Sequence, residues 1–405
     1  MNTPVSLKRT LSLPMMVLYG LGTTIGAGIY ALIGEIAGVA GYFAPISFLL
    51  ASMMAGLTAI SFAELCSRFP QAAGAALYVK QGFSSNRLSI IVGLLVISAG
   101  LVSAAALVNG FVGYLNQFVN IDRNLAVVLV ALLLGTIAVW GIAESVTLAA
   151  LITLIEIGGL LTIVVVGSEG LFSFSERWIE LIPSLDVESW SGIYLGTILS
   201  FYAFIGFEDM VDVAEEVRSV KRTLPIAILL TLGITTLIYM LLMTTAVLSI
   251  PPSELANSKA PLAYLYEFHT GETATAISII GMFAIINGAL IQIIMASRVL
   301  YGLSSRGQLP KFLAFLNSRT RTPVIATALA TTFVLILALI GQLSSLAEAT
   351  SLIMLTIFSM VNLALWRIKQ RDPTPNDAMV FPIWIPMTGF IVSFLFVLNQ
   401  VINLI

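Results

Sequence analysis

Three carboxylates lie in or directly beside long apolar stretches of this sequence, where a charge is expensive to bury. Glu156 is the only charged residue between positions 146 and 168, and Glu208 and Asp209 directly follow the apolar run that ends at Phe207. An ionisable group in such a stretch is a candidate functional site, because it can bind a proton or a cation there. Glu156 and Glu208 are therefore predicted to serve in ion coupling or gating. The alternatives are a charge that reaches the membrane surface for Glu156 and a hydrated helix end for Glu208.

Glycines cluster in the same kind of apolar stretch, at two points. The first stretch holds Gly20, Gly22, Gly26 and Gly28 within nine residues, and Gly206 directly precedes Phe207 and the two carboxylates. Each glycine weakens a helix by about 1 kcal/mol relative to alanine. We expect the helix to be unwound at Gly26-Ala27-Gly28 and again at Gly206, which frees backbone groups for a ligand. Close helix packing of the small-xxx-small type is the alternative explanation for Gly22 and Gly26.

Two such breaks suit a zwitterion. Freed N–H groups at the start of a half-helix attract an anion, and freed carbonyl groups attract a cation. An amino acid carries both charges on one carbon atom. Facing breaks in two helices therefore predict a site for an amino acid between them.

The composition indicates which elements position these residues. Of the 405 residues, 58% are hydrophobic and only 10% are charged, and the mean hydropathy is +1.01. A soluble domain has roughly 25% charged residues, so lipid must be the main solvent of this chain. The net charge of −2 gives no basic surface for nucleic acid, and the single cysteine, Cys66, excludes an intramolecular disulfide framework.

A helix needs about 20 apolar residues to cross the hydrocarbon core of a bilayer. The sequence predicts about eleven such spans, near 12–36, 42–66, 88–117, 124–142, 146–168, 192–214, 223–249, 273–303, 323–341, 345–367 and 380–404. The two breaks fall in the first and sixth spans. This spacing predicts two inverted repeats of five spans, about 12–168 and 192–367, with an extra span at about 380–404.

The distribution of lysine and arginine tests the number of spans. With the N-terminus in the cytoplasm, sixteen of the nineteen basic residues lie on the inner side. These are Lys8, Arg9, Arg68, Lys80, Arg87, Arg218, Lys221, Arg222, Arg298, Arg306, Lys311, Arg319, Arg321, Arg367, Lys369 and Arg371. Only Arg123, Arg177 and Lys259 lie outside. We expect a multi-pass protein of the cell (inner) membrane whose C-terminus, Ile405, is external.

Four segments resemble the amino acid–polyamine–organocation superfamily, whose members have the leucine-transporter-type fold. They are spread over roughly residues 12–370 and occur in the expected order, which makes the resemblance specific. The segments are Gly22 to Gly28, Phe62 to Gly74, Phe204 to Pro225, and Ala296 to Pro323.

The resemblance implies where a substrate binds. Its carboxylate would contact the backbone of Gly26, Ala27 and Gly28, with Thr24 beside it, and its ammonium would contact the carbonyl groups of Tyr202, Ala203 and Ile205. For Asn287 and Gln292, in the eighth span, hydrogen bonding between helices is the preferred interpretation over a place in the pocket. Asp209, Asp212, Glu215 and Glu216 are interpreted as solvated or paired charges at the membrane interface.

The chain departs from its relatives at Glu156, because many of them have a lysine at this position. A desolvated carboxylate can bind a proton near neutral pH, and it could equally coordinate Na⁺. We therefore expect an H⁺-coupled symporter of a small or apolar neutral amino acid, working by alternating access. The alternatives are a Na⁺-coupled symporter, an exchanger of an amino acid for an amine, and a transport-inactive amino acid sensor. No nucleophile–base pair, metal cluster or cofactor motif is found, so neither a cofactor nor an enzymatic activity is expected.

Overall fold

The computed structural model describes residues 9–71, 74–140, 146–305, 307, 309–317, 320, 322–375 and 377–404. Of Ala27, 146–149, 403 and 404 it describes the backbone. Four of the nineteen basic residues, Lys8, Arg306, Arg319 and Arg321, lie outside the described residues, as does Ile405. Within the described part the chain is helical and contains no strand, and one isolated bridge pairs Leu11 with Val217.

Eleven helices of seventeen residues or more lie in the described ranges, and ten of them coincide with a predicted span to within a few residues. The eleven helices are α1 (Leu13–Ala40), α2 (Ala44–Arg68), α4 (Asn86–Leu115), α5 (Arg123–Trp140), α6 (Val146–Val166), α9 (Val187–Phe204), α10 (Val220–Ser249), α13 (Thr275–Ser305), α14 (Val324–Ile340), α15 (Leu343–Arg371) and α16 (Trp384–Leu404). The sixth predicted span, 192–214, is divided between α9 and the 3-10 helix η3 (Phe207–Glu216). Eight stretches of the described residues are long and apolar enough to cross a membrane. Three shorter apolar segments accompany them: Leu13–Gly26, which is the first half of α1, Ala150–Val166, which is part of α6, and Val324–Ile340. The all-helical membrane fold is confirmed.

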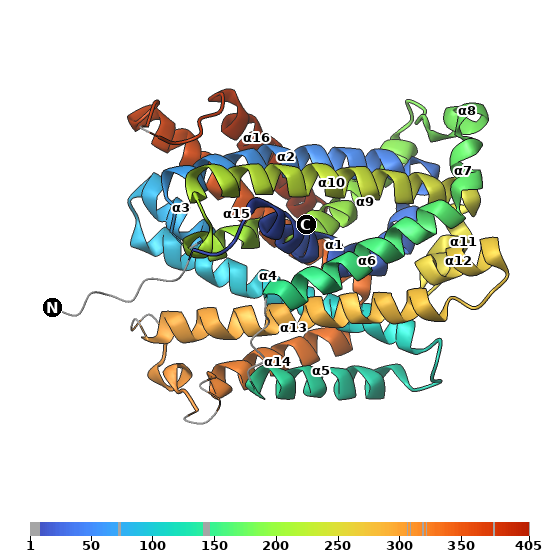
Figure 1. Ribbon diagram of the computed structural model, residues 1–405, viewed down its shortest axis with the longest axis horizontal. Helices are drawn as coiled ribbons and strands as arrows, with labels where there is room; N and C mark the ends of the chain where they lie inside the picture. Colours follow the sequence, from blue (N-terminus) through green and yellow to red (C-terminus); the bar gives the residue numbers. More distant parts are fainter. Residues whose placement is uncertain are drawn as a thin grey trace.

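Short helices cover the two ends of the bundle. At one end lie α3 (Gly74–Phe83) and η4 (Lys311–Ala314), and at the other lie α7 (Ser168–Phe172), α8 (Phe174–Arg177), α11 (Pro252–Asn257) and α12 (Pro261–Thr270) (Figure 1). Two further 3-10 helices, η1 (Gly41–Phe43) and η2 (Trp178–Leu181), connect longer elements. The helices α7, α8, α11 and α12 belong to the segments that the charge pattern assigns to the outside.

The long helices pack in pairs that are five spans apart. The first span, α1, packs against the sixth, α9, and α2 packs against the seventh, α10. In the same way α4 packs against α13, and α5 against α14 (Figure 1). An inverted repeat places equivalent helices of its two halves around a common axis. The pairing is compatible with the predicted repeats, which stay a prediction.

Helix α1 lies at the centre of the bundle and is continuous from Leu13 to Ala40. The predicted unwinding at Gly26-Ala27-Gly28 is therefore wrong for this structure. The glycines instead allow close packing on several sides. A Cβ atom on Gly22 would lie 2.2 Å from the hydroxyl of Thr153 on α6, and one on Gly28 would lie 2.8 Å from the Cα atom of Ala203 on α9.

The sixth span is broken where the sequence predicts it. Helix α9 begins at an N-cap, Asp186, whose carboxylate accepts a hydrogen bond from the N–H of Ser189, and it ends at Phe204. Bonds from Ser184 and Ser189 lower the pKa of Asp186 to about 2. After α9, Ile205 is extended and Gly206 has a φ of 128°, which L-residues rarely adopt. The chain then continues as the 3-10 helix η3 (Phe207–Glu216).

Candidate substrate and ion site

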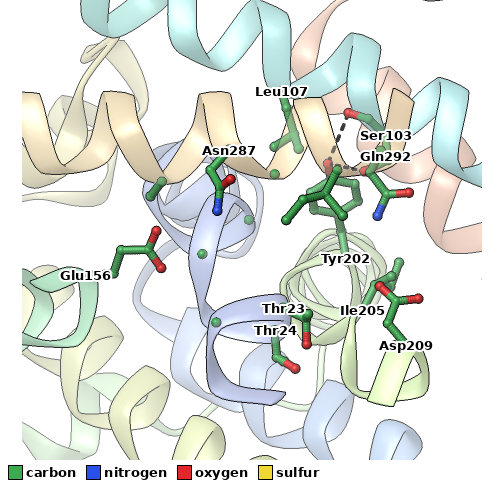
Figure 2. A pocket seen from close by; sticks show the side chains of 16 residues that line it. Thr23, Thr24, Ser103, Leu107, Glu156, Tyr202, Ile205, Asp209, Asn287 and Gln292 are labelled. Carbon is green, nitrogen blue, oxygen red and sulfur yellow. Dashed lines mark hydrogen bonds between the residues drawn. The ribbon is translucent and has the colours of Figure 1, made fainter. Parts of the chain in front are cut away.

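A polar cavity lies in the middle of the bundle, between the broken sixth span and the unbroken first span. The volume open to the centres of water-sized molecules is about 50 Å³, enough for a few water molecules at about 10–15 Å³ each. Residues of six helices line it: Gly22, Thr23, Thr24, Gly26, Gly28, Ser103, Leu107, Glu156, Tyr202, Ile205, Asp209, Ala284, Asn287, Gly288, Ile291 and Gln292 (Figure 2). Six of the predicted site residues, on three separate spans, are therefore brought together.

Glu156 projects into this cavity from the middle of α6 (Figure 2). Its side chain is 3% exposed. Because Gly26 has no side chain, the carboxylate lies close to α1: a Cβ atom on Gly26 would be 3.7 Å from Oε2 of Glu156. The hydroxyl of Tyr30 donates a hydrogen bond of 2.8 Å to the carbonyl group of Glu156 and so ties the two helices together.

The α1 side of the cavity carries two threonines. The hydroxyl of Thr23 donates to the carbonyl group of Gly20, 3.0 Å away. In contrast, the hydroxyl of Thr24 is buried and has no hydrogen-bond partner among the described residues. Burying a hydroxyl without a hydrogen-bond partner costs roughly 1–3 kcal/mol of folding free energy, because its hydration is lost. A ligand in the cavity could supply the missing partner. Of Ala27, the third predicted backbone contact, only the backbone is described, and it is part of the continuous helix.

Polar side chains from α4, α9 and α13 close the cavity on the opposite side. The hydroxyl groups of Ser103 and Tyr202 are 2.9 Å apart and hydrogen-bonded. Asn287 and Gln292, for which hydrogen bonding between helices was the preferred interpretation, line the cavity instead (Figure 2). The cavity is thus more polar than the sequence predicts.

The predicted carbonyl contacts lie at the end of α9, and two of the three already accept hydrogen bonds. The carbonyl group of Tyr202 accepts from the N–H of Ile205, and that of Ala203 accepts from the hydroxyl of Tyr239, 3.0 Å away. Ala203 is buried against α1 and is not among the residues that line the cavity. The C-terminal end of a helix is the negative end of its dipole, so the end of α9 favours a positive group beside Ile205.

The two carboxylates after the break have different places. Oε2 of Glu208 accepts a hydrogen bond of 2.9 Å from the N–H of Gly206, so this side chain caps the broken helix and is not among the cavity-lining residues. Asp209 lines the cavity, opposite Glu156 (Figure 2). The interpretation of Asp209 as a solvated interface charge is therefore wrong. The residue type gave a signal, but the helix type that orients it could not be read from the sequence.

A polar cavity enclosed by apolar spans, one of them broken at mid-helix, is the arrangement of a membrane transporter. Comparison with known families agrees with this class. A family model described as "Amino acid permease" matches residues 10–405. The chain belongs to the amino acid permease family, within the amino acid–polyamine–organocation superfamily.

Relatives of the chain differ in what their names say they transport. It is 30% identical over 389 residues to "Cationic amino acid transporter 2, vacuolar" of Arabidopsis thaliana. The aligned region covers 91% of this chain and 61% of that protein. It is 24% identical over 399 residues to "Branched-chain amino acid permease BcaP" of Bacillus subtilis, with 93% and 84% covered. A "Methylthioribose transporter" of the same bacterium is 24% identical over 407 residues, with 95% and 86% covered. This chain spans less than two thirds of the length of the plant relatives.

Proposed function

We propose that this protein is an H⁺-coupled amino acid symporter that works by alternating access, with the coupling proton on Glu156. The central observation is the cavity, in which a buried carboxylate from the middle of α6 lies close to α1, while the broken sixth span lines the opposite side (Figure 2). A carboxylate at this depth is much less costly when protonated than when charged. Proton binding and release at Glu156 can therefore drive a change between conformations.

We place the amino acid between α1 and the end of α9. Its ammonium lies beside Ile205, where the helix dipole is negative. Its carboxylate lies near Thr24, whose hydroxyl has no partner in the described part of the chain. Backbone contacts with Gly26, Ala27 and Gly28 require α1 to open locally on binding, because a continuous helix uses these N–H groups internally. Four glycines within nine residues lower the free energy of such an opening.

The proposal includes the two repeats, the extra span and the membrane orientation that the sequence predicts. The repeats are about 12–168 and 192–367, with α1 and α9 as the equivalent central helices and about 380–404 as the extra span. The end of the bundle that holds α3 and η4 faces the cytoplasm of a cell membrane, together with the N-terminus. The excess of lysine and arginine at that end supports this orientation.

The substitution Glu156→Gln tests the proton coupling. In proteoliposomes with an inward-directed gradient of one pH unit, the natural protein is expected to accumulate substrate about tenfold, because one pH unit is worth about 1.4 kcal/mol. The variant cannot exchange a proton at this position and is expected to accumulate about onefold. Counterflow of labelled against unlabelled substrate should continue, because it needs no net proton movement.

Other driving forces give different results in the same vesicles. Accumulation that follows a Na⁺ gradient would establish a Na⁺-coupled symporter, and uptake only into vesicles preloaded with an amine would establish an exchanger. Binding without any movement of substrate would establish a sensor. A Glu156→Gln variant that keeps full pH-driven accumulation would refute the role of Glu156.

A cationic amino acid is a second candidate substrate, besides the small or apolar neutral one. The observation that favours it is that two carboxylates, Glu156 and Asp209, line the cavity, and none of its described lining residues is a lysine or arginine. A positively charged side chain would offset the second carboxylate. The names of the plant relatives refer to cationic amino acids.

Competition experiments with Asp209→Asn distinguish these substrates. If the side chain of a cationic substrate faces Asp209, lysine or arginine should inhibit uptake by the variant about tenfold more weakly than uptake by the natural protein, which corresponds to the loss of one charge-assisted bond of about 1.5–3 kcal/mol. Leucine, which has no such charge, serves as the control and should change little. Equal losses for leucine and lysine would instead assign Asp209 to the general shape of the cavity.

A further inference from the structure

The 3-10 helix η3 aligns three carboxylates in one column. A 3-10 helix has 3.0 residues per turn, so side chains three positions apart lie directly above one another. In η3 these are Asp209, Asp212 and Glu215. Their spacing along the axis is about 6 Å per turn, at a rise of about 2.0 Å per residue. An α-helix, with 3.6 residues per turn, would have turned the three side chains progressively apart.

The column leads from the cavity to one end of the bundle. Asp209 is partly buried and lines the cavity, whereas Asp212 and Glu215 are exposed. Directly after η3, Val217 forms the bridge with Leu11, just before α1 begins. The column therefore ends at the same end of the bundle as the start of α1, the end proposed to face the cytoplasm.

The surroundings of Asp212 provide an independent observation. Gly74, at the start of α3, has a φ of 52°, and a Cβ atom there would lie 3.0 Å from Oδ1 of Asp212. One helical turn further along α3, the side chain of Tyr78 is 0% exposed, and its hydroxyl has no hydrogen-bond partner in the described part of the chain. Burial, followed by the charges of Cys66 and Asp212, raises the pKa of Tyr78 well above its ordinary value. The charge of Asp212 therefore acts on a buried, protonated hydroxyl that has no hydrogen-bond partner among the described residues.

Other titratable groups near the column lie on the elements that pack against η3, and most of them form hydrogen bonds or ion pairs or are basic. Four elements pack against η3: α1, α2, α3 and α10. On α2, Glu64 and Arg68 form an ion pair, and the thiol of Cys66 donates to the carbonyl group of Ala63. Charged groups near this end also include the capping carboxylate of Glu208, the neighbouring Glu216, and five basic residues: Arg9 before α1, Lys80 on α3, Arg218 before α10, and Lys221 and Arg222 in its first turn. These basic groups favour the ionised form of the outer carboxylates.

We propose that Asp209, Asp212 and Glu215 form the path by which the coupling proton leaves the cavity for the cytoplasmic side. The inference rests on the proposed H⁺ coupling and adds a route to it. A proton released at the cavity transfers to Asp209 and then, through groups spaced by one turn, to Asp212 and Glu215 at the surface. No bond other than O–H is made or broken, and each carboxylate returns to its charged form when the proton moves on.

The test compares Asp212→Asn with Glu216→Gln in proteoliposomes. Both substitutions remove one negative charge from η3, but Glu216 lies outside the column. Asp212→Asn is expected to slow pH-driven net uptake at least about tenfold, since removal of a positioned proton-transfer group typically costs 10²–10⁴-fold. Counterflow exchange and the apparent affinity for substrate should stay within about twofold, since Asp212 does not line the cavity. Glu216→Gln should match the natural protein in every assay.

Each other outcome has a distinct meaning. Equal losses of net uptake and counterflow in Asp212→Asn would show a structural role and overturn the proton path, as would unchanged net uptake. Equal slowing in Glu216→Gln would show a general effect of charge and overturn it too. Uptake by the natural protein that ignores the pH gradient would refute the proposed H⁺ coupling itself, and the path with it.

Discussion

Replacement of Gly206 by alanine is expected to abolish transport, with a loss of at least about 100-fold in uptake. A Cβ atom at this position would lie 2.1 Å from the carbonyl oxygen of Thr23 and 2.6 Å from its carbonyl carbon. Both atoms belong to the backbone of α1, so no side-chain rotation can relieve the clash. In addition, the φ of 128° is strained for any residue with a Cβ atom.

The size of the expected effect follows from these two terms. A sparsely populated backbone conformation costs about 1–3 kcal/mol, and forcing extra atoms into a packed core costs about 1–3 kcal/mol more. A loss of 2.7 kcal/mol corresponds to about 100-fold in an equilibrium. Because α1 and the end of α9 together form the cavity, their separation removes the site even in molecules that remain folded.

The matched control is Gly233→Ala in α10. A Cβ atom on Gly233 meets no atom within 4 Å, and its φ lies outside the positive range. This substitution is expected to leave uptake unchanged and to raise helix stability by up to about 1 kcal/mol. Uptake and the apparent melting temperature in detergent are measured for both variants. If the Gly206→Ala variant transports with the kinetics of the natural protein, the predicted close contact between Gly206 and the backbone of Thr23 on α1 is wrong.

The comparison of the two predicted breaks shows what glycine patterns can and cannot reveal. At Gly206 the sequence also holds charged residues directly afterwards, and these require a change of environment within two residues; the break is confirmed. At Gly26-Ala27-Gly28 no such second signal exists. Glycine permits both unwinding and close packing, and here the neighbours on α6 and α9 take up the space that side chains would fill.

The choice between Glu208 and Asp209 could not be made from the sequence for a similar reason. The spans themselves follow from long apolar runs, which is a strong signal. Adjacent residues on a helix, however, point in directions about 100° apart in an α-helix and 120° apart in a 3-10 helix. Which of two neighbouring carboxylates reaches the cavity depends on the helix type after the break and on the exact residue where the helix restarts. Neither is encoded in a pattern of apolar residues.

The burial of Lys369 is a third feature that could not be predicted from the sequence. From the distribution of basic residues, Lys369 and Arg68 are predicted to lie on the inner side of the membrane, where positive charge sets the orientation of the chain. In the structure Lys369 is 4% exposed, because its Nζ donates to both carboxylate oxygens of Glu64, at 2.7 and 2.8 Å. A pair of charges 305 positions apart in the chain leaves no local signal in the sequence.

This buried network leads to the second large expected effect: Glu64→Gln should lower the free energy of unfolding by about 3–5 kcal/mol. Glu64 is 0% exposed and accepts bonds from Arg68, at 2.6 and 2.9 Å, from Lys369 and from the N–H of Phe381. One carboxylate thus balances two buried cations. Its neutralisation leaves both without a counter-charge, apart from Asp372, 3.6 Å from Arg68 and 60% exposed.

The network joins the ends of α2 and α15 to the segment that leads into α16, so its loss should be visible as a lower melting temperature of the whole bundle in detergent. Glu180→Gln is the control, because the Arg177–Glu180 pair is exposed and such pairs contribute little. The double variant Glu64→Gln/Lys369→Met should be more stable than Glu64→Gln alone, because it removes one of the uncompensated cations. If Glu64→Gln melts with the natural protein, or if the double variant is simply the sum of two losses, charge balance does not hold these helix ends together.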